Sequence, residues 1–328
     1  MAKVLVTGAA GFIGSAVVRK LLAQGRGVRA LVKPGENTKN LDGLEVEIVS
    51  GDITDRDAMR RVLEGCDVLY HLAAIYALWL PDNKVMYDVN VEGTKTVLWA
   101  AYKANLSRVV YTSSIAAVGL RDDGQPSDET VQFNKWHVAN AYVRSKWLSE
   151  RDALRFAEEG LPLVAVNPAF PFGERDIGPT PTGNFILQML QRKVPGYPDG
   201  GFCAVDVEDV AEAHVQAEQK GRVGERYIAG NHNITWKEFT ETVCEVAGLK
   251  MPKRKLPGVA VRGMAYAIEK IAERQHKKPL MTYKSVLYAQ NNLFFDGSKA
   301  RRELGMPVTP LRTTIDKAVR WFRANGYV

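Results

Sequence analysis

The stretch KVLVTGAAGFIG at residues 3–14 decides the fold. Residues 3–7 are a short, mainly apolar run that ends at a glycine, which is typical of a buried parallel strand. Residues 12–23 carry apolar side chains on one helical face, and glycines at 25 and 27 end the helix. Gly8, Gly11 and Gly14 therefore lie between a strand and a helix. A turn without Cβ atoms lets an anion reach the backbone at the positive end of the helix dipole.

Strands and helices alternate over the next 150 residues. Apolar runs predict further strands at 28–32, 46–49, 68–72, 108–112 and 163–167. Amphipathic runs predict helices at 89–104 and 141–158. This alternation indicates βαβ units and an α/β fold with a Rossmann-type, doubly wound parallel sheet. Small or polar residues follow the strands at Thr7-Gly8, Asp52, Ala73-Ala74, Ser113-Ser114 and Asn167-Pro168. In such a sheet the carboxyl ends of the strands form the ligand crevice.

The pattern changes after Pro168. Residues 168–198 are rich in Pro and Gly, so we expect loops there rather than more sheet. We expect residues 1–168 to form the dinucleotide-binding core, with residues 204–229 returning to it as a strand, a helix and a second short strand. Residues 169–203 and 230–328 are expected to form a smaller, interleaved C-terminal substrate lobe. Further helices are predicted at 235–247, which begins with a capping box, and at 259–272.

Composition excludes several classes of function. The 328 residues carry a net charge of +7 without a long basic block, so we do not expect nucleic-acid binding. The three cysteines lack CxxC spacing and the histidines lack paired spacing, so neither a disulfide framework nor a metal site is expected. The sequence contains no apolar run long enough to span a membrane and no evident signal peptide. We therefore expect a cytoplasmic protein, with peripheral membrane contact left open.

The glycine turn in its strand–helix context predicts a bound nicotinamide dinucleotide. The strand at 28–32 runs into Lys33-Pro34-Gly35, without the acid that usually binds the ribose of NAD. Lys33 could instead face the 2′-phosphate of NADP(H), which is our preferred cofactor, with NAD(H) as the alternative. Lys33 could also be a solvated surface lysine. Asp52 is expected at the adenine edge, unless it only forms a turn.

Tyr142 and Lys146 lie one helical turn apart, and Ser113 and Ser114 end the strand at 108–112. Together these side chains can support hydride-transfer chemistry, because the tyrosine exchanges a proton with the substrate oxygen and a serine polarises the carbonyl. A lysine ~5 Å away at an effective dielectric of ~20 supplies roughly 3 kcal/mol, which lowers the tyrosine pKa by about 2. A second YxxxK at residues 266–270 has no Ser-Ser strand before it, and we assign it to helix packing.

These motifs resemble the extended short-chain dehydrogenase/reductases. The resemblance rests on TGAAGFIG, Gly-Asp at 51–52, HLAA at 71–74, NVEGT at 90–94, YTSS at 111–114, YVRSK at 142–146 and Asn167-Pro168. It implies a catalytic set of Ser114, Tyr142 and Lys146, with Ser113 on the cofactor side, and frequent homodimerisation through two helices per subunit. The cofactor contacts it implies are Gly8, Gly11, Phe12, Ile13, Gly14, Lys33, Asp52, Ile53, Leu72, Ala73, Ala74, Thr112, Ser113, Tyr142, Lys146, Asn167 and Pro168.

Within that family the chain resembles the dihydroflavonol reductase-like branch, which includes proteins labelled hopanoid-associated sugar epimerases. The stretch DIGPTPTG at 176–183 carries this likeness. The acidic pair typical of 4,6-dehydratases does not follow Ser114, and the arginine that usually clamps a nucleotide sugar is missing before Val205. Arg175 or Arg192 could still provide a clamp.

Aromatic residues near the expected crevice predict an apolar substrate pocket, although each could equally belong to the core of the lobe. The pocket residues are Tyr76, Trp79, Ser114, Phe170, Phe172 and Phe202. We expect an NADP(H)-dependent oxidoreductase that interconverts a ketone or aldehyde and an alcohol on an aromatic, steroid-like or lipid small molecule. The alternatives are a nucleotide-sugar epimerase that retains its NAD(P) and a cofactor-binding redox sensor without catalysis.

Overall fold

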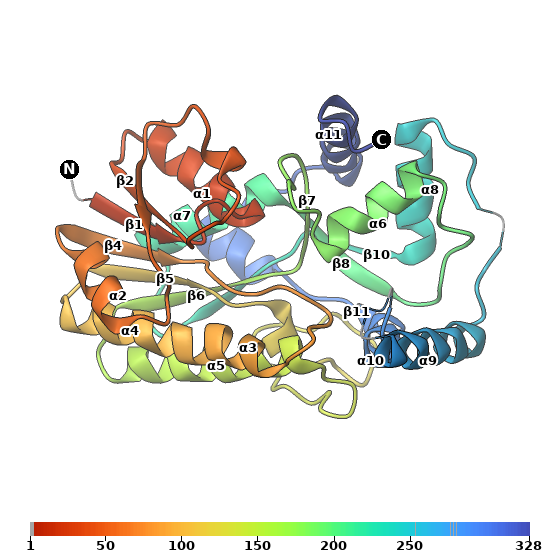
Figure 1. Cartoon of the computed structure of the whole chain (residues 1–328), viewed down its shortest axis with the longest axis horizontal. Coiled ribbons are helices and arrows are strands. Elements are labelled where there is room, and N and C mark those ends of the chain that lie inside the picture. Colours follow the sequence, from red (N-terminus) through yellow and green to blue (C-terminus); the bar gives the residue numbers. More distant parts are fainter. Residues whose placement is uncertain (1–2, 253, 276, 278, 280) are drawn as a thin grey trace.

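The computed structural model describes residues 3–252, 254–275, 277, 279 and 281–328 (Figure 1). Its larger sheet has seven parallel strands in the order β3-β2-β1-β4-β5-β6-β9. The strand order changes direction between β1 and β4, and open α/β sheets bind ligands beyond the carboxyl ends at such a point. The predicted Rossmann-type sheet is confirmed. Its strands are β1 (Lys3–Thr7), β2 (Val28–Val32), β3 (Glu47–Ser50), β4 (Cys66–His71), β5 (Arg108–Thr112), β6 (Leu163–Pro168) and β9 (Arg226–Ala229).

Helices cover both faces of this sheet (Figure 1). One face packs against α1 (Phe12–Ala23) and α7 (Val207–Lys220), and the other against α2 (Arg56–Leu63), α4 (Thr94–Lys103) and α5 (Ala141–Glu158). Successive side chains of a strand point to opposite faces, so Val4 and Val6 join the first core while Leu5 joins the second. Burial on both faces explains why these strands read as continuous apolar runs.

A smaller lobe is built on a four-stranded sheet at the other end of the molecule (Figure 1). Its central strand β8 (Gly201–Asp206) pairs with β7 (Phe170–Phe172), β10 (His232–Thr235) and β11 (Asn292–Leu293). The helices α6 (Pro181–Leu190), α8 (Trp236–Ala247) and α11 (Leu311–Ala324) pack against one another on this lobe. Two further helices, α9 (Gly258–Arg274) and α10 (Tyr283–Ala289), pack together at its outer end. Short helical turns lie at η1 (Lys39–Leu41), η3 (Ile115–Ala117) and η4 (Ala300–Leu304).

Two expectations about the lobe need correction. Residues 168–198 are not only loops, because α6 lies within them; the Thr180 hydroxyl caps it by accepting from the Gly183 N–H, and Pro181 suits its first turn. Of the segment 204–229, α7 and β9 lie in the layers of the core. The strand β8, in contrast, belongs to the smaller sheet.

The helix expected at 89–104 is also interrupted. The structure has a short helix α3 (Lys84–Tyr87), a π-helical turn η2 (Asp88–Gly93) and then α4. Apolar periodicity does not show a π turn, since it changes the register by a single residue. The turn carries Asn90 into the interior, where it contributes to the site below. Along the described ranges, no helix combines the length and the apolar character that a bilayer crossing requires.

Candidate active site

The glycine turn between β1 and α1 has no room for a side chain at Gly8 or Gly14. A Cβ atom at Gly14 would lie 2.0 Å from the Gly8 carbonyl oxygen, and one at Gly8 would lie 2.7 Å from the Ala73 nitrogen. Gly8 also has φ +67°, a conformation that favours glycine. At Gly11 a Cβ would meet the Gly8 oxygen at 3.1 Å. The turn is therefore folded tightly on itself and leaves bare backbone at the amino end of α1, as a pyrophosphate site requires.

Two cavities meet at this turn. Both are lined by Gly8, Gly11, Leu72 and Ala74. The first has about 340 Å³ and extends toward the smaller lobe, and the second has about 410 Å³ and extends over the ends of β2 and β3. Two hollows joined at a glycine turn fit the two nucleoside halves of a dinucleotide with the pyrophosphate between them. The buried Ser113 hydroxyl oxygen lines the first cavity and has no hydrogen-bond partner among the described residues.

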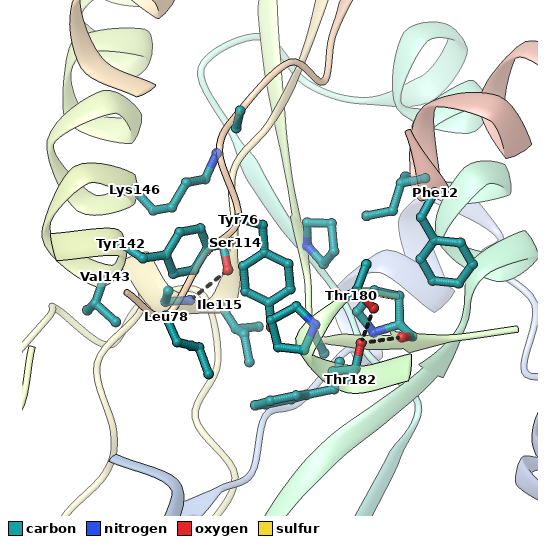
Figure 2. A pocket seen from close by; sticks show the side chains of 18 of the residues that line it. Phe12, Tyr76, Leu78, Ser114, Ile115, Tyr142, Val143, Lys146, Thr180 and Thr182 are labelled. Carbon is teal, nitrogen blue, oxygen red and sulfur yellow. Dashed lines mark hydrogen bonds between the residues drawn. The ribbon is translucent and has the colours of Figure 1, made fainter. Parts of the chain in front are cut away.

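Ser114, Tyr142 and Lys146 line the first cavity together. Tyr142 and Lys146 extend from α5, and Ser114 lies between Tyr142 and Tyr76 (Figure 2). The Asn140 side chain caps α5 by accepting from the Val143 N–H at 2.9 Å, which fixes the start of the helix just before Tyr142. The buried Lys146 ammonium donates to the Thr112 carbonyl oxygen at 2.9 Å, which ties α5 to the end of β5. The Ser114 oxygen accepts from the Ala116 N–H at 3.1 Å.

Burial dominates the titration of these groups. It raises the pKa of Tyr142 to about 12, against a lowering contribution from the Ser114 hydroxyl. This direction is opposite to the one we expected from Lys146, because the phenolate loses its hydration in the cavity wall. Burial also lowers the pKa of Lys146 to about 8, although Glu150 one turn further along α5 opposes that change. At neutral pH the wall of the first cavity thus holds a neutral tyrosine and a mostly protonated lysine.

The rest of the first cavity is apolar. From our list Tyr76, Phe170 and Phe172 line it, and Leu78, Ile115, Phe185, Trp236 and Leu293 extend the same wall. Hydroxyls enter it from Thr180 and Thr182, which lie across from Tyr142 in Figure 2. Trp79 and Phe202, which we also placed in the pocket, line neither of the two cavities. Phe202 is fully buried behind the wall, with ring centroids 5.0 Å from Phe170 and 4.4 Å from Trp236.

Comparison with known proteins identifies the family. The sequence model of the NAD dependent epimerase/dehydratase family matches residues 4–230. The chain belongs to this family. Its motifs make it an extended short-chain dehydrogenase/reductase, and hence an NAD(P)-dependent oxidoreductase.

Three similar proteins cover the chain almost completely. A Synechocystis sp. protein with the provisional name dihydroflavonol 4-reductase is 39% identical, over 98% of this chain and 95% of its own length. The "Sterol demethylase protein B" of Methylococcus capsulatus is 35% identical, over 99% of both chains. The crystal structure of gox2253 superposes with a TM-score of 0.90 and 39% identity, over 100% of both chains.

The end of β2 differs from our expectation. We found no acid near the tip of the strand, but the chain turns back after Lys33, and the Glu36 carboxylate accepts from the Lys33 N–H at 2.9 Å. The Lys33 ammonium lies 3.7 Å from an Asp52 carboxylate oxygen, and its side chain is 65% exposed. Lys33, Glu36, Asp52 and Ile53 all line the second cavity. A basic group and acidic groups therefore share this wall of the second cavity.

Asn167 is near the catalytic set but lines neither cavity. Its side-chain amide donates to the Ser114 carbonyl oxygen at 2.9 Å and to the Glu150 carboxylate. The other Glu150 carboxylate oxygen accepts a hydrogen bond from the Arg226 guanidinium of β9 at 2.6 Å. This buried chain braces the backbone of Ser114 from behind, so Asn167 acts as a positioning residue for Ser114.

Sequence reasoning also missed residues that hold the cavity walls. Asn90 donates to the Ile75 carbonyl oxygen at 3.0 Å and accepts from the Ile75 N–H at 2.7 Å, which fixes the segment that carries Tyr76. Its amide also donates to the Ser145 hydroxyl on α5 at 3.0 Å. Asn90 belonged to a motif of the resemblance, but only the π turn shows where its side chain points. Tyr288 of α10 lines the cavity from the distant C-terminal part, which local pattern could not reveal.

Three further expectations concern charged residues. Neither Arg175 nor Arg192 lines the two cavities, so the structure places no clamp there. Tyr266 and Lys270 of the second YxxxK lie on α9 with more than half of each side chain exposed. The Tyr266 ring still packs edge-on against Tyr283 of α10, with ring centroids 6.2 Å apart, as the assignment to helix packing expects. Among the described residues, no group of three or more His, Cys, Asp or Glu side chains is placed to hold a metal ion.

Proposed function

We propose that the protein is an NADP(H)-dependent oxidoreductase that interconverts a ketone or aldehyde and an alcohol on an apolar substrate. One observation carries the proposal. The Ser114 and Tyr142 hydroxyls meet in a cavity where Lys146 is the single charged side chain among the described lining residues. Hydroxyls that act on a carbonyl oxygen are thus combined with walls suited to an apolar body.

Each of the three side chains has a chemical role in this proposal. The bound nicotinamide would supply or accept the hydride at the substrate carbon. Tyr142, with a pKa of about 12, keeps its proton at neutral pH and can give it to the substrate oxygen during reduction. The Ser114 oxygen accepts from the Ala116 N–H, which leaves its own O–H free to donate to the same substrate oxygen.

Lys146 supports Tyr142 through its charge. Once Tyr142 has given up its proton, a nearby ammonium favours the phenolate that remains. The bond from Lys146 to the Thr112 carbonyl oxygen keeps the ammonium in place, and Glu150 opposes the loss of its proton. We therefore assign catalysis to Ser114, Tyr142 and Lys146, and cofactor contacts to both cavity walls.

The preference for NADP(H) is supported by Lys33. Its exposed ammonium lines the second cavity and could pair with a 2′-phosphate, whereas Glu36 offers an acceptor to a 2′-hydroxyl. A charge-assisted hydrogen bond contributes about 1.5 kcal/mol at such an exposed place, which is about tenfold in affinity. We expect Lys33→Gln to weaken NADPH binding about tenfold in calorimetry and to leave NADH binding unchanged. Tighter binding of NADH than of NADPH by the unmodified protein would contradict the preference.

The apolar substrate class is supported by the cavity walls and by a relative whose name includes a sterol. The test is the oxidation of NADPH by the purified protein with a steroid ketone, an aromatic ketone and a UDP-sugar. We expect turnover with one of the ketones. Conversion of the UDP-sugar without net use of coenzyme would favour the epimerase, and cofactor binding without any turnover would favour the redox sensor.

We also propose a cytoplasmic homodimer. The large apolar side chains Trp99 and Tyr102 on α4 and Leu148 on α5 are exposed along the outer face of the core, and these two helices pack side by side. A second copy would bury them in a symmetric four-helix contact. Analytical ultracentrifugation of Trp99→Asp against the unmodified protein tests this arrangement. A monomeric unmodified protein would contradict it.

A further inference from the structure

The helix α9 turns an apolar face to solvent. Val259, Tyr266 and Ile271 are 72%, 55% and 55% exposed, and Met264 is 46% exposed. Only Ala265 and Ala272 of its 17 residues are buried. A surface helix of a soluble protein normally turns charged and polar residues to water. The exposed face of α9 therefore lacks the composition that water alone would favour.

The same segment carries the net charge of the chain. Residues 250–284 contain ten Lys and Arg against two acidic residues, which gives +8, whereas the whole chain carries +7. The other 293 residues consequently sum to −1. Lys270 and Arg274 lie on the exposed side of α9 between its apolar residues, and Lys277 and Lys284 are exposed beyond it. An apolar helix face within a basic segment matches the chemistry of an anionic lipid surface.

This surface lies one helix away from the first cavity. α9 packs against α10 at the end of the molecule far from β2 and β3 (Figure 1). The Gln290 side chain joins the two helices, because it donates to the Gly258 carbonyl oxygen at 3.0 Å and accepts from Arg262 at 3.1 Å. The other side of α10 supplies Ser285 and Tyr288 to the first cavity. One helix thus separates the exposed apolar face from the site.

We propose that α9 docks the protein on an anionic lipid bilayer. The apolar face enters the boundary between headgroups and acyl chains, and the surrounding Lys and Arg side chains contact lipid phosphates and carboxylates. This part of the inference rests on the proposed function: an apolar substrate would then pass from the bilayer along α10 into the first cavity. A second copy of the chain fits this face poorly, because a two-fold axis would bring two segments of +8 together.

The test is co-sedimentation of the full chain with vesicles of equal parts phosphatidylcholine and phosphatidylserine, and with phosphatidylcholine vesicles. We expect binding to the anionic vesicles and its release at high salt. Each basic residue near the surface contributes about fivefold, so Arg274→Gln with Lys284→Gln should weaken binding about 25-fold. Ile271→Ser should weaken it about fivefold through lost apolar burial.

Matched controls lie elsewhere on the surface. Arg60→Gln with Lys84→Gln removes the same charge at side chains that are 74% and 73% exposed, and Val223→Ser removes an exposed apolar side chain. We expect these variants to bind the vesicles as the unmodified protein does. The proposal is overturned if the unmodified protein stays in solution or if the controls weaken binding as much as the α9 variants. It is also overturned if the α9 variants change the sedimenting mass of the protein, which would make the face a contact between copies.

Activity separates this proposal from the proposed function. Reduction of a small water-soluble ketone should not change in these variants, because Ile271, Arg274 and Lys284 line neither of the two cavities. A protein that binds vesicles but reduces no ketone would support docking and contradict the proposed function. A protein that reduces ketones but does not bind anionic vesicles would support the proposed function and contradict docking.

Discussion

Two glycines of the same turn should fail in different ways when each is changed to alanine. Gly14→Ala places a Cβ atom 2.0 Å from the Gly8 carbonyl oxygen and 2.9 Å from the Gly8 carbonyl carbon. Both neighbours are backbone atoms of the turn, so neither can rotate away. Gly11→Ala meets a single oxygen at 3.1 Å, and Gly11 has φ −69°, which alanine adopts without strain.

The magnitudes follow from these contacts. Overpacking against backbone costs about 3 kcal/mol at Gly14, and replacing a helical glycine by alanine returns about 1 kcal/mol, which leaves about 2 kcal/mol. With an unfolding entropy of ~2.1 cal/mol/K per residue over 328 residues, the melting temperature falls by roughly 3 °C. Gly11→Ala should cost about 1 kcal/mol of stability, because Gly11 is the N-cap of α1 and this position prefers glycine to alanine.

Gly11→Ala should weaken cofactor binding although the protein keeps its fold. The new methyl group occupies bare backbone where the two cavities meet, and it holds the pyrophosphate away from the N–H groups of α1. Losing one charge-assisted hydrogen bond weakens binding by about 10- to 100-fold. Thermal melts without cofactor and calorimetry with NADPH and NADH measure both effects. Wild-type affinity in Gly11→Ala would refute the pyrophosphate site, and a wild-type melting temperature in Gly14→Ala would refute the packing argument.

Three further predictions concern the site and its walls. The rate of carbonyl reduction should decline as pH rises through about 8, because Lys146 is charged below its lowered pKa and loses its proton above it. A rate that stays constant up to pH ~10, where a lysine ordinarily titrates, would contradict this prediction. Asn90→Ala should raise KM and lower the melting temperature, since it breaks both hydrogen bonds to Ile75. A lower melting temperature with an unchanged KM would contradict this prediction. Trp79→Ala should leave KM for an apolar ketone unchanged, because Trp79 lines neither cavity.

Local chain geometry explains which parts of the fold could be predicted from sequence. The strands β1, β2 and β5 have the predicted bounds because each is buried on both faces and ends at a turn or at a small polar residue. The helix α5 was likewise evident from its period and length. The π turn at Asp88–Gly93 and the short strands β7 and β11 were missed, since a one-residue change of register and strands of two or three residues leave little pattern.

The site residues also divide into those that local sequence spacing predicts and those that only the tertiary structure shows. The glycine turn and the Ser114, Tyr142 and Lys146 set are defined by local spacing, and the structure places all of them on the walls of the first cavity. Glu36 was overlooked because a turn, rather than a strand, carries it back to Lys33. Phe202 was expected near the crevice, but it is fully buried and its ring packs against Trp236 in the core. Tyr288 comes from a helix distant in sequence, so only tertiary structure shows it.

The most direct test of the account is the reduction of an apolar ketone by Tyr142→Phe. This change removes one hydroxyl and keeps the ring, so NADPH affinity and melting temperature should stay near those of the unmodified protein. General acid catalysis contributes about 10²- to 10⁴-fold, and kcat/KM should fall by that factor. Tyr76→Phe is the matched control, because its ring centroid lies 4.8 Å from that of Tyr142 and we assign it no proton transfer. A Tyr142→Phe protein with the kcat/KM of the control would contradict the central claim.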